Sequence, residues 1–336
     1  MPHTALRALA ATVLIVAALA GTAGAQAPRL TFPADCILGV DCWYRAYVDL
    51  DPGSTYRDHR CGVRSYDNHR GTDVEPFSPA DPLFRVLAAA AGVVVGVRDG
   101  QDDSPIRDGD TSRQGRECGN GVRIDHGGGW TTQYCHLRRN SVTVNRGTRV
   151  RAGDVLGTIA ASGQADAPHL HFQVERHGTP VDPFTGNAAA RPVRCDATGS
   201  LAGALWSNPA RHGLTAYEPI VVYRAGVSTG RPDQDRALYE GYPRRASTTA
   251  GALVGYVVLL GAPGGSTVDT LIIGPDDDVI YRNRTKVPRD YARYFAFAGT
   301  QRRGARWPSG VYEARFMVAT PDGDYRTAAT TRIVLR

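Results

Sequence analysis

The stretch Pro168-His-Leu-His-Phe-Gln-Val-Glu175 decides the fold of this chain. Its polar and apolar residues alternate, which is the period of a half-buried β-strand. One face of that strand carries His169, His171, Gln173 and Glu175. The other face carries Leu170, Phe172 and Val174, which can enter a hydrophobic core. Two neighbouring imidazoles on a polar strand face suit one metal ligand and one catalytic group, although incidental histidines on a half-exposed strand explain the motif equally well.

Short apolar runs separated by Gly, Asp and Pro continue on both sides of this strand, which is an all-β pattern. In the region 61–185 we predict strands at 92–97, 121–125, 131–137, 141–144, 154–159 and 170–174. The segment 99–119 between them is polar and Gly-rich, and is expected to be a surface loop. We therefore predict an antiparallel β-sheet or barrel-like domain here.

A second β-rich region, 216–336, follows a connector at 186–215. Its predicted strands are 220–223, 257–260, 271–273, 279–281, 294–297 and 311–318. In the last of these strands one face carries Tyr312, Ala314, Phe316 and Val318. Strands at this spacing predict a smaller β-sandwich-like domain.

The N-terminus has the features of a secretory signal peptide over residues 1–25. Arg7 precedes an apolar run at 9–19, and Ala23-Gly-Ala25 is a small-residue cleavage site. The apolar run is short for a transmembrane anchor, and no other segment could span a bilayer. The formal net charge of +6 is spread along the chain without a basic run, so we expect no nucleic-acid partner.

An exported chain with an even number of cysteines is expected to contain disulfides. The six cysteines are Cys36, Cys42, Cys61, Cys118, Cys135 and Cys195. The first two lie in a lead-in at 26–60. The sequence contains no CxxC pair, so a structural zinc site is the weaker interpretation of these cysteines. One pairing can be argued from the residues, because 120–125 and 130–135 flank a Gly-rich turn and predict a hairpin. Such a hairpin brings Cys118 and Cys135 close to register.

Two further patches contain residues that can perform metal chemistry. His69-Arg-Gly-Thr-Asp73 is an HxxxD motif, and its glycine favours a loop or strand entry over a helix. Histidine nitrogen and aspartate oxygen are both good zinc ligands. Gln133-Tyr-Cys-His-Leu137 reads as a strand in which alternation puts Tyr134 and His136 on one face. Taken alone, a single strand histidine is more often a hydrogen-bonded structural residue than a catalyst.

Together these patches resemble the lysostaphin/LytM family of zinc endopeptidases, which carries HxxxD, YxHL-like and HxH motifs in this order. The resemblance covers residues 61–184, and it includes the paired-Gly segment 147–157 and the ending Val181-Asp-Pro-Phe184. It implies that 61–185 is a LytM-type zinc peptidase domain acting on bacterial peptidoglycan. The lead-in resembles that of exported Gram-negative members, so we expect a periplasmic location.

Carried over position by position, the resemblance implies that His69, Asp73 and His171 hold one Zn²⁺ per chain. It implies that His136 and His169 are the catalytic pair. Three protein ligands leave a fourth position open, as catalytic zinc requires. His169 is the better candidate to accept a proton from water, and His136 to hydrogen-bond the developing oxyanion, although the two roles may be shared or exchanged.

Two other functions stay open from the sequence. Related domains that lack metal ligands activate cell-wall amidases, but such a regulator has no need for all five candidate site residues. The C-terminal region could instead make the chain a wall-binding module, with Trp206 and Trp307 stacking on sugars. Packing in a core or turn is the expected role of both tryptophans.

Overall fold

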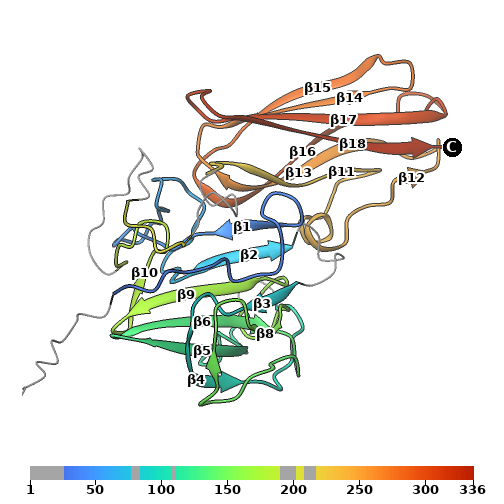
Figure 1. Ribbon diagram of the computed structural model, residues 1–336. Helices are drawn as coiled ribbons and strands as arrows, with labels where there is room; N and C mark the ends of the chain where they lie inside the picture. Colours follow the sequence, from blue (N-terminus) through green and yellow to red (C-terminus); the bar gives the residue numbers. More distant parts are fainter. Residues whose placement is uncertain (1–25, 77–83, 107–109, 190–201, 208–216) are drawn as a thin grey trace, which may run out of the picture.

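The computed structural model describes residues 26–76, 84–106, 110–189, 202–207 and 217–336. The predicted signal peptide, Cys195 and most of the predicted connector lie outside these residues. Almost all regular structure is β-strand, which confirms the predicted all-β class (Figure 1). Within the described ranges, no helix is long and apolar enough to cross a membrane.

An antiparallel sheet of eight strands forms the first half of the structure. Its order is β1-β2-β9-β6-β5-β4-β7, and β10 pairs with the free part of β9. The bounds are β1 (Cys42–Ala46), β2 (Thr72–Pro76), β4 (Gly92–Arg98), β5 (Asn120–Gly127), β6 (Trp130–Leu137), β7 (Arg149–Val150), β9 (Leu170–Arg176) and β10 (Thr179–Val181). A separate two-stranded sheet pairs β3 (Arg85–Leu87) with β8 (Val155–Thr158).

The alternation in β9 sorts its side chains as predicted. Leu170, Phe172 and Val174 are at most 1% exposed and belong to the main hydrophobic core. Burying one such side chain contributes roughly 1.5–3 kcal/mol, so this face alone anchors the strand. Residues of the predicted lead-in pack into the same core, Leu30 and Phe32 among them, and β1 pairs with β2 at the sheet edge.

The predicted hairpin is confirmed as β5 and β6, and it carries the predicted disulfide. Gly127, Gly128 and Gly129 all have positive φ at the turn, a conformation that glycine adopts without steric cost. Cys118 and Cys135 form a disulfide with their Cα atoms 4.7 Å apart. A second disulfide joins Cys36 to Cys42 in the lead-in.

Replacing Cys118 and Cys135 together by serine is expected to lower the free energy of unfolding by about 3 kcal/mol, because the bridge closes a loop of 17 residues. The matched variant, with Cys36 and Cys42 replaced, opens a loop of only 6 residues and should lose about 2 kcal/mol. Denaturant unfolding of both variants measures the difference. Recovery of Cys118 and Cys135 as free thiols in unreduced peptide maps would contradict the pairing.

The second half of the structure, residues 217–336, is a two-layer sandwich. One layer has the order β11-β13-β16 and the other has the order β12-β18-β17-β14-β15. The strands are β11 (Val221–Ser228), β12 (Arg245–Ala246), β13 (Ala252–Ala262), β14 (Thr267–Ile273), β15 (Val279–Lys286), β16 (Tyr291–Gln301), β17 (Gly310–Ala319) and β18 (Arg326–Leu335). Both layers contribute to one core, and the β17 face predicted from the sequence lies in it. A short π-helix, η2 (Arg236–Glu240), connects β11 to β12.

One predicted strand is not a strand in the structure, and several observed strands, β1, β2 and β18 among them, were not predicted. The segment 141–144 is not a strand, because its backbone bonds do not form a ladder: the Val142 N–H donates to the carboxylate of Asp99, 3.1 Å away. β18 was not predicted, since its sequence Arg-Thr-Ala-Ala-Thr-Thr-Arg lacks a clear apolar face. Its pairing with β17 along ten residues compensates for that weak pattern.

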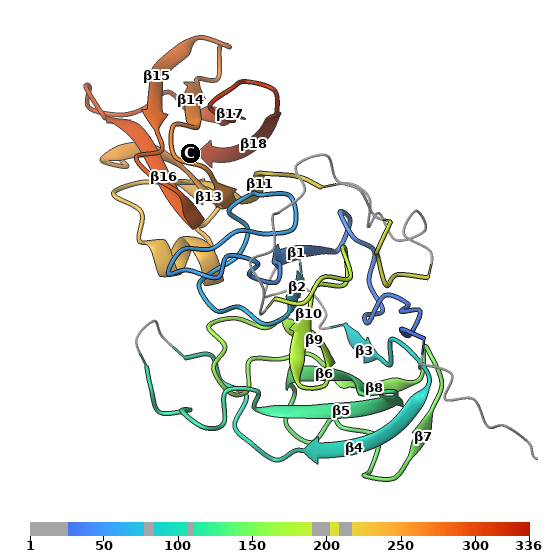
Figure 2. The same cartoon turned by 90° about the vertical axis from the view of Figure 1, so that its left-hand side faces the viewer.

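The sandwich lies beyond β1, the edge strand of the eight-stranded sheet (Figures 1 and 2). Trp43 of β1 packs against an apolar cluster of the sandwich that includes Tyr223 and Leu238. An ion pair joins Arg57 to Asp290 across the same boundary, with 3.0 Å between Nη1 and Oδ2. The two halves are therefore in direct apolar and ionic contact.

Candidate metal and catalytic site

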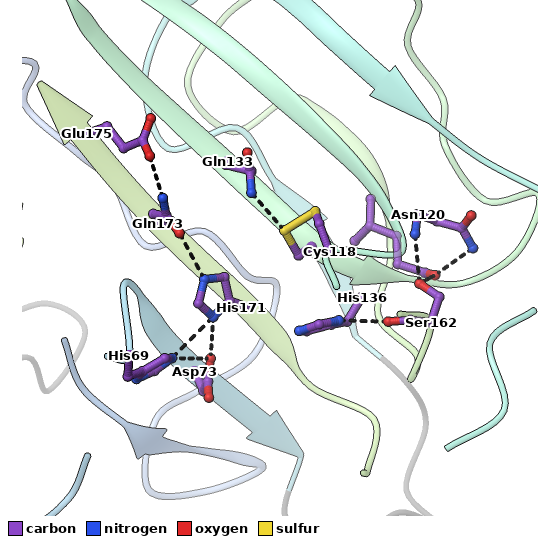
Figure 3. Close-up of a disulfide and its surroundings, with 12 residues drawn as sticks. His69, Asp73, Cys118, Asn120, Gln133, His136, Ser162, His171, Gln173 and Glu175 are labelled. Atoms are coloured by element: carbon purple, nitrogen blue, oxygen red, sulfur yellow. Dashed lines mark hydrogen bonds and ion pairs between the residues drawn. A yellow bond between two sulfur atoms is a disulfide. The ribbon is translucent and has the colours of Figure 1, made fainter. Parts of the chain in front are cut away.

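Strand register brings the predicted ligands together at the centre of the eight-stranded sheet. Asp73 of β2 is paired directly with His171 of β9, and His69 lies in the loop that leads into β2. His69 Nε2 is 3.1 Å from Asp73 Oδ1, His171 Nδ1 is 2.9 Å from the same oxygen, and the two nitrogens are 3.2 Å apart (Figure 3). Gly71 permits this approach, since a Cβ there would lie 2.7 Å from the His171 ring.

Hydrogen bonds on the far side of each ring determine which nitrogen is free for a metal. Nδ1 of His69 is 2.7 Å from the carbonyl oxygen of Tyr47, which can only accept, so the hydrogen is on Nδ1. The Gln173 amide donates to Glu175 at 2.5 Å, so its oxygen faces Nε2 of His171, 3.2 Å away, and accepts that hydrogen. Both inward-facing nitrogens therefore carry lone pairs. Such outer partners are typical of metal-binding histidines.

Three acceptor atoms facing one another need a cation between them. Their separations are close to the ~3.3 Å expected between ligands of a tetrahedral zinc with bonds of about 2.0–2.1 Å. The chemistry and geometry of this donor set fit zinc.

His136 reaches this site by a route that the sequence did not predict. The prediction that it shares a face with Tyr134 is wrong: Tyr134 packs against Phe172 in the core, whereas the His136 ring centroid is 4.6 Å from that of His169. The physical reason is a left-handed backbone conformation at His136, with φ of 64°, which interrupts the alternation of β6. Non-glycine residues rarely adopt this conformation, and strained examples cluster at functional sites.

The structure places His169 just before β9, beside the carboxylate of Asp73, with Nε2 3.9 Å from Oδ2. Nδ1 of His136 is 2.7 Å from the Ser162 carbonyl oxygen, and Nδ1 of His169 is 2.8 Å from that of Ala167. Both rings therefore keep an unprotonated Nε2. Burial lowers the pKa of each ring, and the neighbouring histidines lower that of His136 further, so both are neutral at pH 7.

An open cleft of about 580 Å³ runs over the site. His69, His136 and His171 lie in its wall together with charged and amide side chains, Arg70, Arg123, Glu117, Gln133, Gln164, Gln173 and Glu175. Tyr66 stacks on the His69 ring at 4.2 Å and lines the same cleft. A second hollow of about 570 Å³ shares His69 and Arg70, so an extended polar chain could cross the site.

Several groups that orient the site were not identified from the sequence. Three of these groups are backbone carbonyls, which no side-chain pattern in the sequence marks. They belong to Tyr47, Ser162 and Ala167, and only the structure assigns their roles. The two tryptophans do not form an exposed sugar platform. Trp206 is 1% exposed in the main core, and Trp307 donates its indole N–H to the Ala250 carbonyl at 2.8 Å, so the expected packing role is confirmed for both.

Residues 67–183 match the family model described as peptidase family M23. This part of the chain is similar to peptidase family M23. The matched residues contain all five candidate site residues and all of the cleft wall except Tyr66, so the resemblance to lysostaphin/LytM-type enzymes is confirmed. The chain outside this M23 segment is not covered by the match.

The curated relatives match over only a part of this chain. The peptidoglycan DD-endopeptidase ShyC of Vibrio cholerae is 33% identical over 118 residues, which are 35% of this chain and 22% of that protein. The DD-carboxypeptidase/endopeptidase Mpg of Neisseria gonorrhoeae is 36% identical over 87 residues, 24% of this chain and 20% of that protein. The chain thus spans about a fifth of the length of these relatives.

A solved structure that matches this chain is the catalytic domain of the antimicrobial peptidase lysostaphin from Staphylococcus simulans. The two chains are 22% identical, and the match covers 42% of this chain and 87% of the lysostaphin domain with a TM-score of 0.29.

Proposed function

We propose that this protein is an exported zinc metalloendopeptidase that hydrolyses peptide bonds in bacterial peptidoglycan. The observation that carries the proposal is the lone-pair arrangement at the site. His69, Asp73 and His171 present three unprotonated acceptors to one point, and His136 and His169 present two more unprotonated nitrogens beside it. A non-catalytic regulator would not need this arrangement.

The residues divide into a metal set and a proton-transfer set. One zinc ion, held by His69, Asp73 and His171, would polarise the scissile carbonyl and lower the pKa of a water molecule to about 7. His169 Nε2 would accept a proton from the attacking water, because the ring is neutral and lies beside Asp73. The proton that His169 takes up would pass to the leaving amine, and His136, when its Nε2 has taken up a proton from solvent, would hydrogen-bond the developing oxyanion. The hydrogen bond from His136 Nδ1 to the Ser162 carbonyl keeps the ring in place.

The substrate class rests on the cleft and on the relatives. An open groove with amide, carboxylate and guanidinium groups suits an extended peptide whose own amide and carboxylate groups need partners. ShyC and ShyA of Vibrio cholerae, both named peptidoglycan DD-endopeptidases, are 33% and 35% identical to this chain over 118 and 70 residues. Peptidoglycan lies outside the cytoplasm, which is consistent with the proposed signal peptide and a periplasmic location.

We further propose that the chain is organised into the units predicted from the sequence, with a peptidase domain at 61–185 and a β-rich domain at 216–336. The separate hydrophobic cores of the two halves support this division. β1 pairs with β2, so the lead-in at 26–60 is structurally part of the peptidase sheet.

Digestion of purified sacculi by the mature protein is expected to release cross-link or stem-peptide fragments that mass spectrometry identifies. Chelation should abolish the release, because the bound zinc is the Lewis acid of the proposed reaction and no side chain of the site can replace it. Added zinc should restore the release. If the zinc-loaded protein releases no fragments but stimulates a wall amidase, the endopeptidase proposal is wrong and the regulator function replaces it.

A further inference from the structure

A loop without regular secondary structure, residues 162–169, orients both candidate catalytic histidines. The Ser162 carbonyl at its start accepts from His136 Nδ1, and the Ala167 carbonyl near its end accepts from His169 Nδ1. A shift of this loop would therefore move both rings relative to the metal ligands. We call residues 162–169 the orienting loop.

The first half of the orienting loop is held by the eight-stranded sheet. The Ser162 hydroxyl accepts from the backbone N–H of Asn120 at 2.9 Å and donates to the Leu137 carbonyl at 2.8 Å. The Gln164 N–H donates to the Glu117 carbonyl at 2.8 Å. These contacts fix the loop near His136. Two backbone hydrogen bonds hold the rest of the loop, from Ile106 N–H to the Ala165 carbonyl at 2.9 Å and from His169 N–H to the Ala160 carbonyl at 3.1 Å.

In the second half of the loop the Asp166 carboxylate adds side-chain contacts, and its partners come from both halves of the protein. Arg45 of β1 donates to this carboxylate at 2.6 and 2.8 Å. Arg293 of β16 donates to Oδ2 at 2.8 Å, and the hydroxyl of Tyr239 in η2 donates to the same oxygen at 3.3 Å. Two of the three side chains that hold Asp166 therefore belong to the C-terminal sandwich.

The surroundings of this contact make it stronger than an ordinary surface ion pair. The Asp166 and Arg45 side chains are each 15% exposed and that of Arg293 is 22% exposed, so water screens the charges only in part. Arg45 also lies 3.9 Å from Glu75, which is 3% exposed. The sandwich thus completes a balanced group of two cations and two anions at the edge of the peptidase site.

We infer that the C-terminal sandwich is a positioning element of the peptidase site. Its Arg293 and Tyr239 hold Asp166 and thereby fix the orienting loop. The carbonyls of this loop align His136 and His169. This inference rests on the proposed function for its effect on catalysis, but the restraint on the loop exists whether or not the protein is a peptidase. Arg293 and Tyr239 touch neither the candidate metal ligands nor the cleft wall. They are positioning residues and not catalytic ones.

The test compares Arg293→Met with Arg57→Met in the full-length protein. Arg57→Met breaks the other ion pair across the boundary, Arg57–Asp290, which does not contact the orienting loop. In Arg293→Met, hydrogen exchange of peptides covering residues 162–169 should become about 10- to 100-fold faster, because a charge-assisted bond has been lost. In Arg57→Met it should equal that of the original chain.

Kinetics on a soluble cross-linked muropeptide should separate positioning from binding. In Arg293→Met, kcat should fall about tenfold or more while KM and zinc content stay within about twofold, because the ligands and the cleft wall are untouched. Arg293→Lys should recover most of the loss, since a single donor nitrogen contacts Asp166. Tyr239→Phe, which removes only a hydroxyl, should give a smaller effect in the same direction and serves if Arg293→Met does not fold.

Each unfavourable result has a defined meaning. Unchanged exchange and unchanged kcat in both Arg293→Met and Tyr239→Phe would overturn the inference. Equal losses of kcat in Arg293→Met and Arg57→Met would also overturn the inference. Such a result would show that activity depends on docking of the whole sandwich and not on the Asp166 contact. If the original chain itself cleaves no muropeptide, the proposed function fails, and faster exchange in Arg293→Met still supports the restraint on the loop.

Discussion

Replacing His171 by alanine is expected to leave the purified protein almost without zinc. The substitution removes His171 Nδ1, which lies 2.9 Å from Asp73 Oδ1 and 3.2 Å from His69 Nε2. The two remaining ligands do not hold zinc during dialysis. The variant should therefore also lose hydrolysis of peptidoglycan. Metal analysis of the protein after extensive dialysis measures the first effect directly.

Gln173→Ala is the graded control for this result. It keeps all three ligands but removes the amide oxygen that holds the hydrogen on Nε2 of His171. Loss of such an outer partner typically weakens metal affinity by about 10- to 100-fold, so this variant should bind zinc measurably but less tightly. Full zinc occupancy in dialysed His171→Ala would exclude His171 as a ligand.

His136→Ala and His169→Ala are expected to separate catalysis from metal binding. Both should fold and keep zinc, since neither ring belongs to the group of three donors at the metal position. Both should lose activity by roughly 10²–10⁴-fold, the usual contribution of a positioned proton-transfer group. Zinc analysis and rates of muropeptide cleavage on the same preparations provide the two measurements.

A histidine outside the site gives the matched control for these two variants. His177 lies exposed at the turn after β9 with φ of 51°, a conformation that asparagine also tolerates, so His177→Asn should leave both zinc content and rate unchanged. If His169→Ala empties the metal site while His171→Ala does not, the two roles are reversed. If neither His136→Ala nor His169→Ala slows cleavage, the assignment of a catalytic pair fails.

Predictions from sequence succeeded where local periodicity carries the information. The alternation of 168–175 placed Leu170, Phe172 and Val174 in the core, and the Gly-rich turn predicted both the β5–β6 hairpin and the Cys118–Cys135 bridge. These features depend on neighbours that are close along the chain. Where periodicity was weak, as in β18, or misleading, as in 141–144, the prediction missed the strand or placed one wrongly.

The composition of the site and its assembly have different origins. The sequence by itself determined the all-β class and, through three ordered motifs, the residues that we propose hold and use a metal. Only the tertiary structure decided how they meet, because strand register pairs Asp73 with His171 and a left-handed residue turns His136 from the core face to the site. It also decided that Arg293, 127 residues from Asp166 along the chain, supports the orienting loop. No local pattern encodes a contact that forms only when two separate hydrophobic cores pack side by side.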